Sequence, residues 1–134
     1  MLLLLLSLLV TSCGKSRFKP TYPVKGRVLV DGEPAEGVTV RFHSLDDPDD
    51  ELVRPVATTD ANGSFLLTTY NVNDGMPAGS YAVSLFWLPK GFQGPIERGN
   101  KLPERYSKAA TSGIKVQIAA GENVLPPFEL EKKK

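Results

Sequence analysis

The sequence predicts an all-β protein, a seven-stranded antiparallel sandwich of roughly immunoglobulin size. From residue 22 onward apolar and polar side chains alternate with a period of two, and no segment of helical length shows a 3.6-residue period. Turn-forming Gly, Pro, Asn and Asp residues recur about every ten residues. The 134 residues, 41% hydrophobic and 23% charged, suffice for one small domain and would crowd two.

The first three strands are predicted over residues 24–30, 38–43 and 53–59. Apolar side chains occupy alternate positions in the first two segments. Between these two strands, residues 31–37 supply the Asp, Gly and Pro that favour a turn. The charged loop 46–51 contains a proline and is unsuited to a strand interior, so the third strand is expected only after it.

The remaining strands follow a tight turn at residues 60–63. Phe65 and Leu67 open the fourth strand, and the most apolar segment, residues 80–88, is the expected central strand. Its core face is predicted to carry Tyr81, Val83, Leu85 and Trp87. Alternating apolar residues predict a sixth strand over 114–118. A seventh, over 124–130, is confined to an edge or a bulge by Pro126-Pro127, since proline has no N–H to donate.

The N-terminus predicts export and lipidation. Residues 2–10 form an apolar run too short to span a bilayer as a helix but typical of a signal peptide. Val10-Thr11-Ser12-Cys13 resembles a bacterial lipobox, in which a small residue precedes the Cys whose thiol takes the lipid. We therefore predict a signal peptide over 1–12 and lipidation at Cys13. The alternative is cleavage elsewhere, with Cys13 incidental.

The rest of the chain divides into three parts. Residues 13–21 are basic and almost free of apolar side chains, which predicts a lipidated tether that reaches about 25 Å when extended. The sandwich domain is predicted over 22–131, and a basic tail over 132–134. Positive charge at both ends would favour an anionic lipid surface, although both ends could simply be solvated.

Composition argues against several function classes. The 16 Lys and Arg nearly balance 15 Asp and Glu, which does not indicate a nucleic-acid partner. With one Cys and one His, the chain cannot form an intrachain disulfide or the usual Cys/His zinc site, and we predict neither metal nor cofactor. The single candidate base, His43, is expected on the solvent side of its strand, which disfavours a Ser/His/Asp device.

Three ordered motifs resemble carboxypeptidase regulatory-like domains: residues 24–28 with the turn 31–37 and its return strand, Thr59-Asp60-Ala61-Asn62-Gly63-Ser64-Phe65, and Pro77-Ala78-Gly79-Ser80-Tyr81-Ala82-Val83. The resemblance implies an immunoglobulin-like, transthyretin-like (prealbumin-like) sandwich in a small bacterial lipoprotein. It also implies a non-catalytic module, because these motifs form turns and core and bring no catalytic group.

The leading hypothesis is a lipid-anchored cell-envelope module that is structural or binds a partner, an unknown envelope protein or a glycan. It would face the periplasm, at the outer membrane by resemblance, or lie on the cell surface. Binding is expected in the long loop 89–105, and the candidate residues are Trp87, which directly precedes the loop, and Phe92, Ile96 and Arg98 within it.

Three alternatives use specific residues. A carbohydrate-binding module would need the rings of Trp87 and Phe92 exposed and coplanar. A transthyretin-like hydrolase is opposed by the shortage of His. A Lys25–Asn123 isopeptide bond, as in related pilin-type sandwiches, is disfavoured because Lys25 is out of phase with the apolar positions of its strand.

Overall fold

The computed structural model describes residues 17–134. The predicted signal peptide, Cys13 and the start of the predicted tether lie outside the described residues. Within 17–134 the chain forms nine strands and two short helical turns. The strands are β1 (Val24–Val30), β2 (Glu33–Pro34), β3 (Val38–Ser44), β4 (Val56–Thr58), β5 (Ser64–Leu66), β6 (Gly79–Trp87), β7 (Lys115–Ile118), β8 (Asn123–Val124) and β9 (Phe128–Leu130), and the helical turns are α1 (Ile96–Gly99) and the 3₁₀ turn η1 (Glu104–Ser107).

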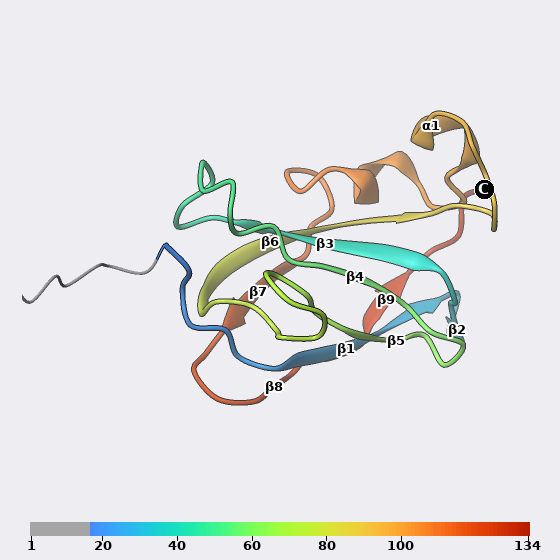
Figure 1. The fold of residues 1–134 in the computed structure, drawn as a ribbon. Coiled ribbons are helices and arrows are strands. Elements are labelled where there is room, and N and C mark those ends of the chain that lie inside the picture. The colour runs from blue at the N-terminus through green and yellow to red at the C-terminus, as the bar shows by residue number, and fades with distance from the viewer. Residues whose placement is uncertain (1–16) are drawn as a thin grey trace, which may run out of the picture.

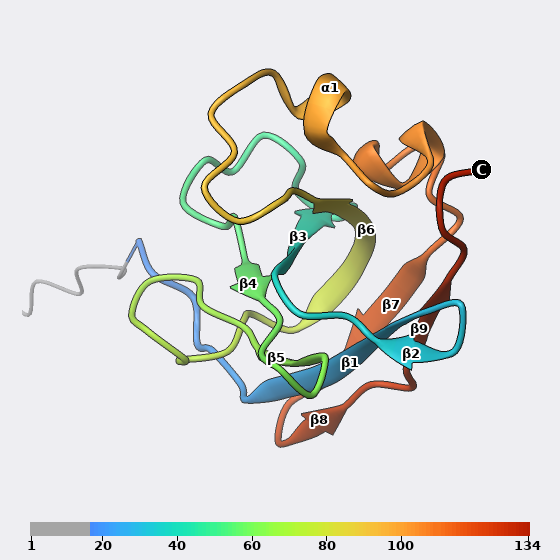
Figure 2. The same cartoon turned by 90° about the vertical axis from the view of Figure 1, so that its right-hand side faces the viewer.

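The strands form two facing sheets (Figures 1 and 2). In the first sheet, β1 is central: β2 and β5 pair with it antiparallel along one side, and β8 and β9 pair with it parallel along the other. The second sheet has the order β4-β3-β6-β7 and is antiparallel throughout. The all-β sandwich is therefore confirmed.

Each predicted strand position contains a strand, but the C-terminal one differs in two respects. The segment 124–130 is divided into β8 and β9 at Pro126-Pro127, where the backbone lacks donors. Both pieces run parallel to β1, so the first sheet is mixed where we expected antiparallel pairing. The turn 31–37 also contains the two-residue strand β2, which pairs with the end of β1.

The core lies between the sheets and contains a line of aromatic rings that crosses from one sheet to the other. Phe65 stacks on Phe128 in the first sheet, with ring centroids 5.8 Å apart. Phe128 contacts Phe42 at 6.4 Å, and Phe42 meets Tyr81 edge-on at 6.2 Å in the second sheet. The buried Tyr81 hydroxyl donates to the Pro77 carbonyl at 2.7 Å, so its polar end is satisfied. Burial is the main cause that raises the pKa of Tyr81 to about 12.

The Phe65 ring requires a glycine on the neighbouring strand. Gly26 pairs directly with Phe65 in the register of β1 and β5. A Cβ atom at position 26 would collide with the tip of that ring. Because Gly26 has no side chain, the ring covers bare backbone and reaches Phe128. Gly26 occupies a core position on its strand and leaves room there for Phe65.

The long connection from β6 to β7, residues 88–114, covers the outer face of the second sheet, and we call it the covering segment (Figure 1). Its Leu102 and Tyr106 are buried, and Ala82 and Ser84 of β6 are buried on the outer side of that strand. The central strand is therefore covered on both faces, which accounts for its unusually apolar sequence. Among residues 17–134, no helix is long and apolar enough to cross a membrane.

We predict that Gly26→Ala destabilises the domain by about 1–3 kcal/mol, because the added methyl group overpacks the Phe65 ring. Chemical denaturation measures the free energy of unfolding. Lys25→Ala, at an exposed position of the same strand, should change it by less than about 0.5 kcal/mol. In a Phe65→Leu background the Gly26→Ala penalty should shrink, and equal penalties in both backgrounds would contradict the overpacking explanation.

Candidate functional site

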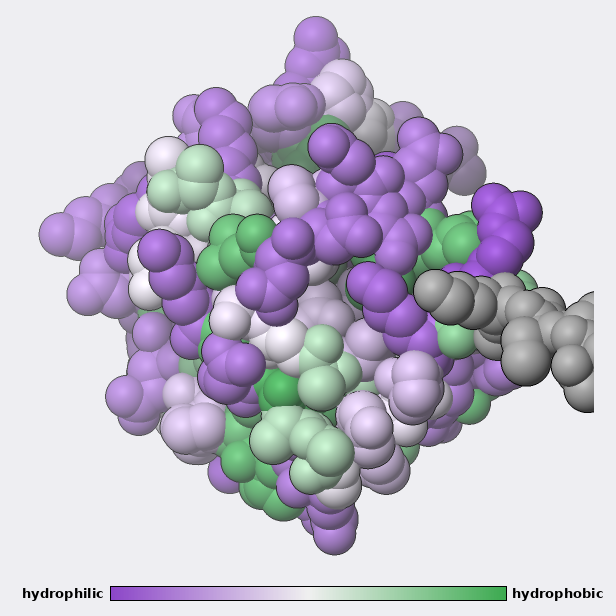
Figure 3. All heavy atoms as spheres, turned by 90° about the vertical axis from the view of Figure 1, so that its left-hand side faces the viewer, coloured by the Kyte–Doolittle hydropathy of each residue, from purple (hydrophilic) through white to green (hydrophobic). Residues whose placement is uncertain are grey.

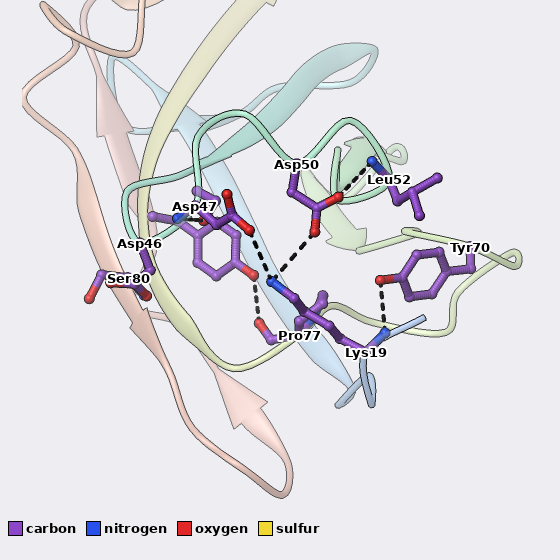
Figure 4. Close-up of polar contacts among 10 residues, drawn as sticks. Lys19, Asp46, Asp47, Asp50, Leu52, Tyr70, Pro77 and Ser80 are labelled. Atoms are coloured by element: carbon purple, nitrogen blue, oxygen red, sulfur yellow. Dashed lines mark hydrogen bonds and ion pairs between the residues drawn. The ribbon is translucent and has the colours of Figure 1, made fainter. Parts of the chain in front are cut away.

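The N-terminal segment docks on the folded domain before the first strand begins (Figure 4). The Phe18 ring meets Tyr70 edge-on, with centroids 4.9 Å apart, and the Lys19 backbone N–H donates to the Tyr70 hydroxyl at 3.2 Å. The Lys19 ammonium lies 3.5 Å from the Asp50 carboxylate and 3.9 Å from that of Asp47. We call Phe18, Lys19, Asp47, Asp50 and Tyr70 the N-terminal clamp.

The acidic loop that supplies the clamp is held in place by its own hydrogen bonds. The Asp46 carboxylate accepts from the Ser80 backbone N–H at 2.8 Å, which ties the loop to the start of β6. Asp50 also accepts from the Leu52 N–H at 3.0 Å. Within residues 17–134, no group of three or more His, Cys, Asp or Glu side chains is arranged to hold a metal. The carboxylates of Asp46, Asp47 and Asp50 are engaged with the backbone or with Lys19.

The two aromatic residues of the predicted binding site, Trp87 and Phe92, are engaged within the domain. Trp87 is half-buried, its indole N–H donates to the Glu36 carbonyl at 2.8 Å, and the Lys101 ammonium lies 4.5 Å from the ring centroid. Phe92 lies against Gly99, where a Cβ atom would come within 2.6 Å of its ring. These contacts give each ring a structural partner and do not favour a flat sugar-stacking platform.

The other two predicted residues lie in different surroundings. Ile96 and Arg98 both belong to α1. Only Ile96, which is half-buried, lines the cleft between the covering segment and the second sheet that is described next. Arg98 is exposed on α1. The structure therefore distributes the four predicted residues over different surroundings and does not bring them together as one site.

A cleft of about 330 Å³ lies between the outer face of the second sheet and the covering segment, and we call it the outer cleft. His43 Nε2 lies 2.7 Å from the Ser84 hydroxyl oxygen. Nearby, the Arg41 guanidinium lies 5.1 Å from the Phe86 ring centroid. Burial is the largest cause that lowers the pKa of His43, and the positive charges of Arg41 and Arg54 add to it. The cleft is lined by Arg41, His43, Ser84, Phe86, Ile96, Glu97, Asn100, Leu102, Glu104, Ser107, Lys108 and Lys133.

The His43–Ser84 pair lacks two features of a nucleophilic device. Ser84 is only 4% exposed, so its hydroxyl is poorly placed to meet a substrate. Ser84 is the hydrogen-bond partner of the His43 ring within residues 17–134, and no carboxylate of this part orients the ring. The sequence placed His43 on the outer strand face correctly, but gave no sign that Ser84 of the neighbouring strand would lie beside it.

A larger groove of about 950 Å³ runs along β1, β5 and β8 of the first sheet and reaches β4, the edge strand of the second sheet, and sequence reasoning missed it. Leu66 and Val124 occupy outward positions there and are 51% and 66% exposed. Large apolar residues at outward strand positions are the signal that could have indicated this surface. We call it the β1 groove; it is lined by Lys25, Gly26, Arg27, Val56, Ala57, Thr58, Asp60, Ser64, Phe65, Leu66, Thr68, Asn73, Val124, Leu125 and Pro127.

Lys25 and Asn123 come close in the fold but are engaged elsewhere. The Lys25 ammonium lies 3.7 Å from Glu122. The Asn123 side-chain amide donates to the Ala119 and Gly121 carbonyls at 2.9 and 3.2 Å, closing its own turn. This geometry agrees with the sequence argument against an isopeptide bond.

No protein-family model matches the sequence, and no curated protein matches it. Two solved structures are similar in chain trace. One is a DUF3823 family protein from Parabacteroides merdae, with a TM-score of 0.48 and 14% identity over 87% of this chain and 47% of that one. The other is BcpA, the major pilin subunit of Bacillus cereus, with a TM-score of 0.48 and 14% identity over 85% of this chain and 30% of that one. The chain spans less than half the length of either.

We predict that weakening the clamp exposes the Arg17–Phe18 bond to trypsin, because a protease needs the local backbone free to extend. Asp50→Asn should raise the cleavage rate at this bond about two- to fivefold, in line with the modest strength of an exposed ion pair. Tyr70→Phe, which removes the acceptor of the Lys19 N–H, should act in the same direction. Mass spectrometry of the products measures the rate. Asp49→Asn in the same loop is the control, and an equal effect there would contradict the clamp.

We also predict that His43 makes stability depend on pH. Its folded pKa lies below the ordinary value of 6.5, so the unfolded chain binds a proton more readily than the folded one. The contribution of neutral His43 to the free energy of unfolding is therefore fully present above pH 6.5. It is lost as the pH falls through 6.5 toward the folded pKa. Thermal unfolding of wild type and His43→Gln between pH 8 and 5 should show a difference that changes over this window, whereas parallel curves would contradict it.

Proposed function

We propose that this protein is a lipid-anchored module of the bacterial cell envelope, without catalytic activity, that is structural or binds a partner. The observation that carries the proposal is the order of features at the N-terminus. A lipobox-like Val10-Thr11-Ser12-Cys13 is followed, after four residues, by Phe18 and Lys19 docked on the domain. An anchor on Cys13 would therefore connect to the sandwich through a very short segment.

The clamp determines how far the domain could stand from the bilayer. From Cys13 to Phe18 the chain advances five residues, which span at most about 17 Å when extended. Without the clamp, the free segment would extend to the start of the domain at residue 22 and could reach about 30 Å. With the clamp closed, the end of the sandwich that holds Tyr70 and the acidic loop would stay close to the lipid headgroups.

The proposal that the module is non-catalytic is supported by the roles of its motif residues. Asp60 Oδ1 accepts from the backbone N–H groups of Asn62 and Ser64, at 2.9 and 3.0 Å, and so closes the turn into β5. Gly63 follows with a φ of 72°, and a Cβ atom there would lie 2.6 Å from the Val28 carbonyl oxygen. These are structural roles, as the resemblance to carboxypeptidase regulatory-like domains implies.

The surface proposed for a partner is the covering segment with its Ile96 and Arg98. It lies on the outer face of the second sheet, away from β1 (Figure 1). Trp87 and Phe92 would act there as supports of the segment, because their rings contact Lys101 and Gly99. A protein partner suits this surface better than a sugar that stacks on both rings.

We predict that the natively expressed protein is heavier than the chain from Cys13 by a diacylglycerol and an acyl group, and that it fractionates with membranes. Cys13→Ala should carry neither group and should leave the membrane fraction. Intact mass and membrane fractionation measure both outcomes. Ser16→Ala, outside the lipobox-like motif, is the control and should behave like wild type. An unlipidated wild type would refute the anchor.

A further inference from the structure

The outer face of the first sheet is unusually apolar for a surface without a partner. Leu66 of β5 and Val124 of β8 are 51% and 66% exposed there, and Val56 of β4, at the adjoining edge of the second sheet, is 37% exposed. All three line the β1 groove, together with the basic residues Lys25 and Arg27. We propose that the β1 groove is a membrane-contact surface that lies on the lipid headgroup layer. The inference rests on the proposed anchor at Cys13, which would bring the bilayer to this face.

The strand register arranges these residues in the order that a lipid surface would favour. Lys25 of β1 pairs with Leu66 of β5 on one side and with Val124 of β8 on the other. The three therefore form one row across adjacent strands, with a cation between two apolar side chains. Such a row can insert its apolar members at the acyl boundary while the long lysine reaches a lipid phosphate. Arg27, two residues along β1, continues the same face.

The cations of the groove have only weak partners within the domain. The Lys25 ammonium faces Glu122 at 3.7 Å, and the two side chains are 54% and 69% exposed. An ion pair this exposed contributes little to stability, so Lys25 can exchange Glu122 for a phosphate. Arg27 donates from Nε to the Asn62 carbonyl at 3.1 Å, which leaves its terminal nitrogens to a ligand. The carboxylate of Asp60, also in the groove, accepts from the backbone of its own turn.

The groove is adjacent to the point where the anchor would attach. Thr68 and Asn73 line its edge, and the Thr68 hydroxyl accepts from the Asn73 N–H at 2.8 Å. Tyr70 of the clamp lies between these two residues in the same loop, so anchor and groove share one structural element. Figure 3 shows hydrophobic residues at several places on this end of the molecule, including the lower half, on the side of β1 and β8.

Because the anchor would be short, a weak contact between the β1 groove and the bilayer would be enough to orient the domain. A lipid held within about 17 Å of the clamp presents the bilayer to the groove at high effective concentration, so contact costs little additional translational freedom. The groove, with its exposed Leu and Val side chains and two cations, would not bind free vesicles tightly. In a tethered domain, however, it can determine which side of the domain faces the bilayer. The outer cleft and Arg98, on or beside the opposite sheet, would then remain accessible to a partner.

The test uses the single Cys, so that it does not depend on acylation in the cell. The chain from Cys13 is coupled through this thiol to vesicles that contain a maleimide lipid and a headgroup-attached spin label. In a Trp87→Phe background, Leu66→Trp places the sole indole in the β1 groove. Lys108→Trp places it at an exposed position of the outer cleft as the matched control. We expect the Leu66→Trp fluorescence to be quenched at least about twofold more strongly than that of Lys108→Trp.

A second substitution tests the row itself. Adding Val124→Asp to the Leu66→Trp protein should abolish the excess quenching, while Ala110→Asp in the covering segment should leave it intact. Thermal unfolding of the uncoupled proteins checks that each variant folds. Equal quenching at positions 66 and 108 overturns the proposal, and would leave the groove to a protein partner. Intact mass tests the cellular anchor separately, so failure of the anchor and failure of the membrane-contact surface give different results.

Discussion

The contact between the Phe65 ring and the bare backbone of Gly26 is the constraint on which the sandwich depends most. With the ring over Gly26, Phe65 reaches Phe128, and the line of rings continues through Phe42 to Tyr81 in the second sheet. The two sheets are thus joined by a line of rings that includes a stacked pair and an edge-on pair, arrangements that aromatic quadrupoles favour. A side chain at position 26 would displace the first ring, and each later contact depends on the one before it.

The two outer faces of the sandwich differ because the connections between strands are unequal. The long segment between β6 and β7 covers one face and buries Leu102 and Tyr106 against it. Within residues 17–134 no comparable segment covers the first sheet, and its outward Leu66 and Val124 stay exposed. The clamp fixes the N-terminal segment beside the uncovered face. This asymmetry links the fold to the proposed function, since one face is free for the bilayer and the other carries the covering segment.

The sequence predicted those features of the fold that depend on the local alternation of apolar and polar residues. Val24, Val28 and Val30 identified the core face of β1, and Tyr81, Val83 and Leu85 that of β6, because a period of two reports burial directly. It did not predict the parallel pairing of β8 and β9, since their register with β1 is set by tertiary contacts far away in sequence.

The candidate functional site was harder to predict from the sequence than the fold. Trp87 and Phe92 were singled out as aromatic residues near a long loop, but their roles depend on Lys101 and Gly99, which no local pattern identifies. The row of Leu66, Lys25 and Val124 comes from three separate strands, and only the pairing brings its members together. Likewise, Lys19 looked like part of a solvated tether until the fold placed Asp50 and Tyr70 beside it.

The pairing of β9 with β1 also bears on how the chain acquires its structure. Val28 lies opposite Phe128, so this part of the first strand finds its partner on one side about one hundred residues later. Contacts of such high sequence separation must close a large loop before they stabilise anything, and topologies rich in them fold slowly. Until residue 130 has been synthesised, one side of β1 has no partner, and Phe65 lacks the ring on which it stacks. The first sheet of such a chain is therefore completed last, when its C-terminal strands become available to β1.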